Sequence, residues 1–349
     1  MRFASPPAAT AEPSALAVQL RANRRWRWGS LLLALALLAI LSLASLALGA
    51  KAIPLPEVAA ALTGGPASPE AVSLVIGLRL PRTVAGLVVG AALGLAGALI
   101  QALTRNPLAD PGILGVNAGA AAAVALAVGL LGIDQPGYYV LFGLVGALVA
   151  SIVVSALGLG DPLRLVLVGM ALGAVLAGLT GAIRLTDRQA FNAMVAWELG
   201  SLTDKSWNVI LPLIPFALAG AVIALAIGPA LDALVLGQDT ATSLGVNLLL
   251  TRVLAVAAIS LLAGSATALA GPISFIGLMV PHLARRLTGP SQPWVLALSA
   301  LFGPSLLLAA DIIGRLVVSP AEIKAAIVTA FIGAPILIHL ALRPKLVTL

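Results

Sequence analysis

Residues 83 to 103 read TVAGLVVGAALGLAGALIQAL, a stretch of 21 residues that carries no charge. A helix needs about 20 apolar residues to cross the roughly 30 Å of hydrocarbon in a bilayer, so this stretch predicts a membrane-spanning helix. Comparable apolar runs lie at about 30–49, 112–132, 138–157, 163–183, 209–229, 253–272, 273–287, 293–314 and 323–342. The sequence therefore predicts an all-α polytopic membrane protein with about ten transmembrane helices.

The overall composition agrees with this prediction and leaves little chain for a soluble domain. Of the 349 residues, 60% are hydrophobic and only 9% are charged, and the mean hydropathy is +1.11. The hydrophobic and charged fractions lie far from the averages of soluble globular proteins. We expect a cytoplasmic, disordered N-terminal tail at residues 1–29, a transmembrane domain at residues 30–343 and a short cytoplasmic tail at residues 344–349.

Several kinds of chemistry are missing from the sequence. The absence of cysteine excludes a disulfide framework, a thiolate metal site and a cysteine nucleophile. No lysine lies in a G-x-x-x-x-G-K-[ST] loop, and no carboxylate stands at metal-ligand spacing from His282 or His339. Basic residues are scattered, which argues against nucleic acid as a partner. We therefore expect no enzyme activity, no cofactor and no metal site in this chain.

The distribution of charge predicts an orientation. With ten crossings and a cytoplasmic N-terminus, 12 of the 20 Lys and Arg residues lie inside, and both termini are cytoplasmic. Charged residues are nearly absent from the middles of the predicted helices, where each is costly. Asp311, beside Arg315, is the nearest candidate for ion coupling. An ion-coupled secondary transporter therefore stays open as an alternative from another class.

Glycines recur at four-residue spacing in two predicted helices, as Gly86, Gly90 and Gly94 and as Gly169 with Gly173. Such spacing is typical of close helix packing in membranes. Residues 90–97 and 264–271 also match at Gly, Ala, Leu, Ala and Gly positions. This match predicts an inverted internal repeat that relates helices 2–5 to helices 7–10.

Several blocks of sequence resemble, in one order, the transmembrane permease of ABC importers for iron siderophores, haem and vitamin B12. The blocks are RLPR (79–82), GAALGLAG (90–97), LTRNPLADPG (103–112), LGVNAG (114–119), WELGSL (197–202), LGQDTATSLG (236–245), FIGLMVPHLAR (275–285) and GAP (333–335). The resemblance covers about residues 30 to 343 and makes the transmembrane domain a permease domain. It implies ATP hydrolysis on two separate cytoplasmic subunits, a second permease subunit that is identical or a paralogue, and a periplasmic or lipid-anchored binding protein.

The resemblance also implies roles for particular residues. The segment with Leu236, Gly237, Asp239, Ala241, Leu244 and Gly245 resembles the coupling helix that contacts the ATPase, and we expect Ala241 to lie against that subunit. The turn with Gly160, Asp161, Pro162 and Leu163 corresponds to the inner gate. Arg79, Arg82 and Arg315 match positions that meet glutamates of the binding protein. The alternative for these arginines is anchoring to lipid phosphate or neutralisation of Asp311 and Glu322.

The substrate is inferred from resemblance among members of that family. The blocks at 104–107, 115–119 and 311–315 are closest to ferric siderophore permeases, especially catecholate ones, while haem or cobalamin import stays an alternative. One departure concerns the loop SPAEIKAA at residues 319–326. The family commonly has Pro and Gly at the positions of Lys324 and Ala326. The sequence thus predicts a ferric siderophore importer subunit in the cytoplasmic membrane.

Overall fold

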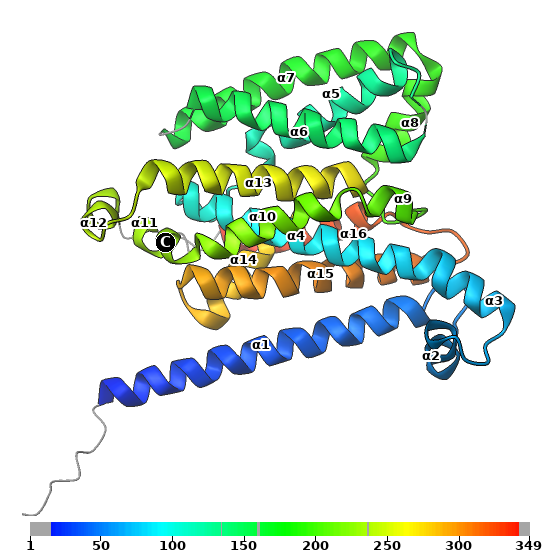
Figure 1. Cartoon of the computed structure of the whole chain (residues 1–349), viewed down its shortest axis with the longest axis horizontal. Coiled ribbons are helices and arrows are strands. Elements are labelled where there is room, and N and C mark those ends of the chain that lie inside the picture. The colour runs from blue at the N-terminus through cyan, green and yellow to red at the C-terminus, as the bar shows by residue number, and fades with distance from the viewer. Residues whose placement is uncertain (1–14, 134, 159–160, 236, 342–349) are drawn as a thin grey trace, which may run out of the picture.

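A computed structural model describes residues 15–133, 135–158, 161–235 and 237–341, and these residues contain helices and no strand. Most of the long helices run side by side (Figure 1). The elements are α1 Ala15–Ala47, α2 Leu55–Thr63, α3 Pro69–Val72, η1 Ser73–Arg79, α4 Leu80–Thr104, η2 Pro111–Leu114, α5 Val116–Gly129, α6 Pro136–Gly158, α7 Pro162–Thr186, α8 Arg188–Glu198, α9 Trp207–Ile210, α10 Ile214–Ala226, α11 Gly228–Val235, α12 Gln238–Ser243, α13 Leu248–Ala270, α14 Ile276–Thr288, α15 Gln292–Val317 and α16 Ala325–Ala341.

Six of the described helices are long and apolar enough to cross a membrane: Arg25–Ala47, Pro69–Thr104, Gly137–Gly158, Leu163–Thr186, Leu248–Ala270 and Gln292–Val317. The pair α10 and α11, bent by 51°, can form a seventh span. The other predicted runs contain the shorter helices α5, α14 and α16. The prediction of an all-α polytopic protein is confirmed, whereas length and composition identify six or seven full crossings in the part of the chain that the structure describes.

The first helix begins earlier than the sequence analysis predicts. α1 starts at Ala15, so residues 15–29, predicted as part of a disordered tail, are helical. Ala, Leu, Gln and Arg, which favour helix, are frequent in this stretch, and nothing in it breaks the helix before the apolar run starts.

α4 lies in the middle of the bundle and packs against α13, α14 and α15. A Cβ atom added to Gly90 would lie 2.3 Å from the Pro304 Cα atom, and one added to Gly94 would lie 2.3 Å from the Ser299 carbonyl oxygen. The glycine seam of α4 is therefore confirmed as a packing surface that lets the backbone of α15 approach closely.

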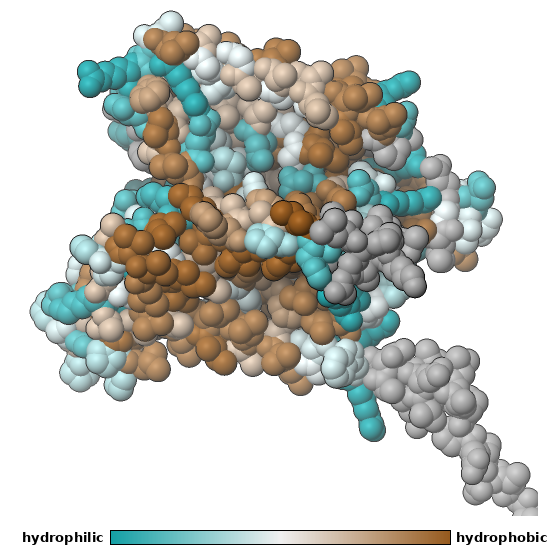
Figure 2. All heavy atoms as spheres, turned by 180° about the vertical axis from the view of Figure 1, so that it is seen from behind, coloured by the Kyte–Doolittle hydropathy of each residue, from teal (hydrophilic) through white to brown (hydrophobic). Residues whose placement is uncertain are grey.

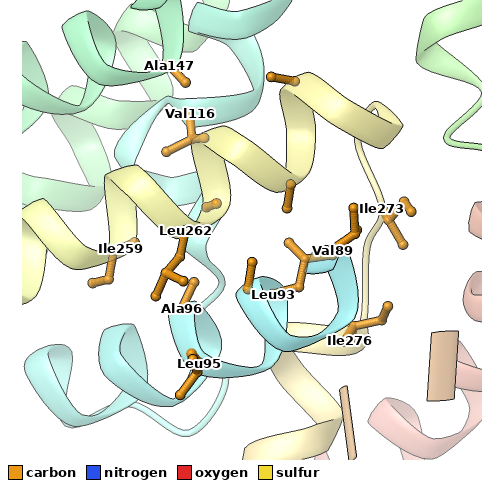
Figure 3. Close-up of a cluster of buried hydrophobic side chains, with 14 of the residues drawn as sticks. Val89, Leu93, Leu95, Ala96, Val116, Ala147, Ile259, Leu262, Ile273 and Ile276 are labelled. Carbon is orange, nitrogen blue, oxygen red and sulfur yellow. The ribbon is translucent and has the colours of Figure 1, made fainter. Parts of the chain in front are cut away.

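The hydrophobic core joins α4 to α13 and to neighbouring segments. Figure 3 shows Val89, Leu93, Leu95 and Ala96 of α4 with Ile259 and Leu262 of α13, Val116, Ala147, Ile273 and Ile276. α4 packs on α15, and α13 packs on α6. The predicted repeat relates α4 to α13 and α15 to α6, so these two contacts have the arrangement that an inverted repeat predicts.

The bundle has two opposite ends, the α2 end and the α12 end (Figure 1). The α2 end contains α2, α3, α8 and α9, together with the end of α1. The α12 end contains α11 and α12, and α1 starts there. Between the ends, hydrophobic side chains cover broad areas of the surface, while hydrophilic groups gather mainly toward the ends (Figure 2). This distribution is expected of a bundle surrounded by lipid.

Candidate functional site

The α2 end contains a cluster of buried ions around Arg82. The Arg82 guanidinium forms two contacts with Asp311, Nη2 to Oδ1 at 2.8 Å and Nε to Oδ2 at 3.0 Å, and its Nη1 atom lies 2.9 Å from Glu322 Oε2. Arg315 Nη2 lies 3.2 Å from Asp311 Oδ2. The Asp311 side chain is only 1% exposed, so its charge depends on these cations. Ion coupling through Asp311 is disfavoured because both of its oxygens are already paired with arginine.

Arg79 and Arg315 attach the end of α1 to the rest of the bundle. Arg79 donates hydrogen bonds through Nη1 and Nη2, and Arg315 donates through Nη1. Their acceptors are the carbonyl oxygens of Ser45, Leu46, Ala47, Leu48 and Lys51. The last carbonyls of a helix have no intrahelical partner and carry partial negative charge, so a guanidinium stabilises them. The two arginines thus hold the end of α1 against the end of η1 and against α15.

The structure brings the three predicted docking arginines together, but not as free cations on a rim. Arg79 is 7% exposed and Arg315 is 3% exposed, and their guanidinium groups are hydrogen-bonded within the chain. Arg82 neutralises Asp311 and Glu322, as the alternative in the sequence analysis predicts. In this structure Arg79 and Arg315 are thus engaged within the chain, and the docking role expected of the three arginines stays a prediction.

A cavity of about 490 Å³ lies beside this cluster. It is lined by residues of the α1–α2 link, of η1 and the start of α4, and of the segment 203–206, which includes Lys205. Lys205 is half-buried, and burial first and the nearby charge of Lys324 second lower the pKa of its ammonium to about 8. Lys205 is a candidate site residue that the sequence analysis missed, because Lys324, whose charge acts on it, is far away along the chain.

At the α12 end, α12 lies between two glycines in the left-handed region of backbone conformation. Gly237 has φ 123° and Gly245 has φ 79°, backbone angles that residues other than glycine rarely adopt. The backbone thus turns at both glycines, as expected, and the coupling role of the segment between them stays a prediction.

The side chains of this segment differ in their exposure. Ala241 is fully buried within its own chain, so it presents no exposed surface here, and its expected contact with an ATPase stays a prediction. Leu244 is 65% exposed instead, and Asp239 is exposed in the first turn of α12. Leu236 lies outside the described residues. An exposed apolar side chain at the end of a short helix is suited to insertion into a cleft of another protein.

Near the α12 end, residues of the sequence blocks around 103–112 and 275–285 form hydrogen bonds that join neighbouring helices. Arg105 Nη2 donates to the Leu234 carbonyl at 2.6 Å, which ties the end of α4 to α11 just before α12. Gln101 Nε2 donates to the Gly277 carbonyl at 3.0 Å, and Arg285 donates to the Gln101 side-chain oxygen. Gln101 is a second residue that the sequence analysis missed, because one polar residue in an apolar run carries no motif.

The predicted inner gate is described in part. Asp161 caps α7, with the Leu163 backbone N–H donating to Asp161 Oδ1 at 2.9 Å, and Leu163 is 67% exposed. Gly160 and the side chain of Pro162 lie outside the described residues. The cap fixes where α7 begins and therefore where the exposed Leu163 lies.

Two further cavities lie along the helices. One, of about 410 Å³, is lined by small residues of α5 and α7 together with Arg184, Trp197 and Glu198. The other, of about 460 Å³, lies among α1, α14, α15 and α16, and both His282 and His339 line it. No group of three His, Asp or Glu side chains in the described part of the chain is close enough to hold a metal ion.

Comparisons with known proteins agree with this architecture. The model of the FecCD transport family matches residues 37–343. The chain is 48% identical to the ferric enterobactin transport system permease protein FepD of Escherichia coli K12, over 88% of this chain and 93% of that protein. It is 38% identical to the vitamin B12 import system permease protein BtuC of Vibrio vulnificus, over 93% and 97%. A solved structure titled as an inward-facing, metal-chelate type ABC transporter superposes with a TM-score of 0.79 at 29% identity, covering 88% of this chain and 96% of that chain.

Proposed function

The chain belongs to the FecCD transport family, and we propose that within this family of siderophore, haem and vitamin B12 permeases it moves a ferric siderophore across the cytoplasmic membrane. The observation that carries the choice of substrate is the 48% identity to a ferric enterobactin permease, which exceeds the 38% identity to a vitamin B12 permease. The sequence blocks that resemble catecholate siderophore permeases support the same choice. Haem or cobalamin import is the alternative within this architecture.

As a subunit of an ABC importer, the chain works with ATPase and substrate-binding partners. We propose that it contains no catalytic group and pairs with a second permease subunit, either identical or a paralogue. Two ATPase subunits would lie at the α12 end in the cytoplasm, with both termini on that side. A periplasmic or lipid-anchored binding protein would dock at the α2 end. The start of α1 at the α12 end, together with the basic residues at 21–27, supports this orientation.

The geometry at the α12 end supports a route by which ATPase movement reaches the membrane helices. An ATPase that moves α12 pulls on α11 and α13, which flank it in the chain. Arg105 transmits the displacement of α11 to the end of α4 through its hydrogen bond to Leu234. α4 lies at the centre of the bundle, so a shift of its end changes the packing of several helices at once. The gate proposed at residues 160–163 lies at this same end, where α7 begins.

At the α2 end, docking is proposed around Arg82. The buried Arg79 and Arg315 contribute by holding α1, and therefore the wall of the docking surface, in place. Arg82 is 11% exposed on its side chain and pairs with Asp311 and with Glu322, which is 28% exposed, so a partner carboxylate would compete with Glu322 while Arg82 keeps Asp311. Complementary charge at such a surface mainly sets register and association rate.

The function is tested by uptake into proteoliposomes that contain the chain, its ATPase subunits and its cognate binding protein. Vanadate should arrest uptake of the ferric chelate, and a proton uncoupler should leave it unchanged. Uptake that survives vanadate but collapses with the uncoupler would replace the ABC importer with an ion-coupled carrier. The compound that co-purifies with the binding protein separates ferric siderophore from haem and cobalamin.

The coupling assignment predicts a sharp effect at Leu244. Leu244→Glu should leave membrane insertion intact and reduce substrate-stimulated ATP hydrolysis by about tenfold or more, because a charge replaces an apolar contact of over 1 kcal/mol at the ATPase cleft. Leu244→Met is the matched control and should keep near-normal turnover. Normal turnover in Leu244→Glu would show that the ATPase does not contact α12.

A further inference from the structure

Two segments that are far apart in the sequence are held together at the α2 end. Thr203 Oγ1 donates to Glu322 Oε2 at 3.2 Å, and the Ala326 backbone N–H donates to the Gly200 carbonyl at 3.2 Å. Lys324 lies between these two points of attachment, so it is held against the segment that contains Lys205. The effect of the Lys324 charge on the Lys205 ammonium agrees with this proximity. The fold thus brings the segments of the two lysines together, near enough for the charge of Lys324 to act on Lys205.

Neither lysine has an ion pair within the described part of the chain. The neighbouring carboxylates are already used: Glu322 pairs with Arg82, Asp311 pairs with Arg82 and Arg315, and Glu70 pairs with Lys51. Asp204 favours the charged form of Lys205 through space, but it forms no salt bridge with it. Two half-buried ammonium groups with like charge and no counter-ion are unfavourable, because burial reduces their solvation and Coulomb repulsion adds to the cost.

The start of α16 adds to the positive potential at the same place. The backbone N–H groups of Ile327 and Val328 both donate to the Lys324 carbonyl, so Lys324 sits at the first turn of this helix. A helix N-terminus carries partial positive charge and is stabilised by anions, not by lysine. The cavity of about 490 Å³ that Lys205 lines lies beside the pair. An anion in this cavity would relieve the repulsion between the two lysines.

We propose that Lys205 and Lys324 form a seat for an anionic iron chelate at the α2 end, through which the transporter favours negatively charged ferric chelates over neutral ones. This inference rests on the proposed function in ferric siderophore transport. A ferric tris-catecholate is a trianion, because three doubly deprotonated catecholates outweigh iron(III), whereas a ferric trishydroxamate is neutral. A lysine ammonium is a flexible point charge, which suits a rounded anion without a planar fork of oxygens.

The proposal is tested by titrating the purified permease and ATPase complex with iron(III) tris-catecholate in the absence of a binding protein. Quenching of tryptophan fluorescence reports binding, since Trp207 follows the seat in the chain. Lys205→Gln with Lys324→Gln should weaken tris-catecholate binding at least tenfold and leave binding of a neutral ferric trishydroxamate unchanged. Lys51→Gln is the matched control, because Lys51 lines the same cavity but is already paired with Glu70 at 2.6 Å.

A pH series adds a second readout. Lys205 loses its charge as the pH rises through about 8, so tris-catecholate binding should weaken between about pH 7 and pH 9. Lys205→Arg should abolish this dependence, because arginine stays protonated. The charged groups around Lys205 are Lys324, Asp204 and, on the cavity wall, Lys51, Arg79, Arg82, Arg315 and Glu322. Of these cations, Lys324 is the one whose charge lowers the pKa of Lys205.

Each other outcome overturns the proposal. Unchanged tris-catecholate binding in the folded double variant would show that the lysines do not recognise the chelate. An equal loss for both chelates would assign them a structural role. Loss of association with the binding protein, with normal chelate binding, would place them in the docking surface. Vanadate-sensitive uptake is measured separately, so failure of the proposed transport function can be distinguished from failure of the proposed chelate seat.

Discussion

The helices α4 and α7 have the same character in the sequence and opposite environments in the structure. Both are long, apolar and free of charge in their middles, and both carry glycines at four-residue spacing. In the span Pro69–Thr104, which contains α4, 78% of the most apolar window is buried inside the chain, against 17% in Leu163–Thr186 of α7. A Cβ atom at Gly90 would clash with α15, whereas one at Gly178 or Gly181 would meet nothing within 4 Å.

This difference shows that hydropathy identifies which segments avoid water but not which neighbour they meet. A membrane helix can bury its side chains against other helices, against lipid or against another subunit, and all three environments are apolar. α4 packs against α13, α14 and α15 of its own chain. α7 packs on α5, α6 and α8 and leaves Met170 and Val175 more than 65% exposed. That exposed face of α7 is suited to the second permease subunit proposed above.

The largest expected effect comes from replacing one glycine in each helix. Gly90→Leu should prevent correct folding, because a Cβ atom there would lie 2.3 Å from the backbone of Pro304 and neither backbone can move without opening the core. Gly178→Leu should fold normally, because the position is open. Monodispersity in detergent and thermal unfolding check both variants. If both fold equally well, α4 is not packed against α15 as described.

The positions of the helices were predictable from the sequence, because a run of apolar residues is a local property. The environment of each side chain was not, because it depends on contacts between distant segments. Arg79 and Arg315 border a predicted helix end, and only the fold shows that both reach the final carbonyls of α1. Ala241 belongs to a recognisable segment, and only the fold shows that it is fully buried between the turns at Gly237 and Gly245.

The next effect compares ion pairs near the two helices. Asp311, which pairs with Arg82 at the start of α4, is almost fully buried, so Asp311→Asn should lower the free energy of unfolding by about 3 kcal/mol because two arginines lose their shared counter-ion. Glu198, which pairs with Arg184 at the end of α7, is 37% exposed on its side chain, so Glu198→Gln should cost less than about 1 kcal/mol. Thermal unfolding of both variants in the same detergent measures the difference. Equal shifts would contradict the contrast in burial between these two regions.

The smallest effect concerns Lys205, in the segment between α8 and α9 that joins the two regions. The pKa of Lys205 is lowered from 10.5 to about 8, so the folded chain releases this proton before the unfolded chain does. Between about pH 8 and pH 10.5 the unfolded state therefore binds more protons, and the stability contributed by this group rises with pH. The wild-type chain without chelate should gain stability between pH 8 and pH 10, by less than about 1 kcal/mol because water screens the half-exposed ammonium. Lys205→Gln should remove this gain and should be more stable than the wild type at pH 7. The control Lys51→Gln should change neither the pH dependence nor the stability at pH 7, because Lys51 is exposed and paired with Glu70. The contrary result is a wild-type stability that stays flat or falls between pH 8 and pH 10, with the same pH dependence in Lys205→Gln. It would show that the Lys205 ammonium is as well solvated in the folded protein as in the unfolded chain.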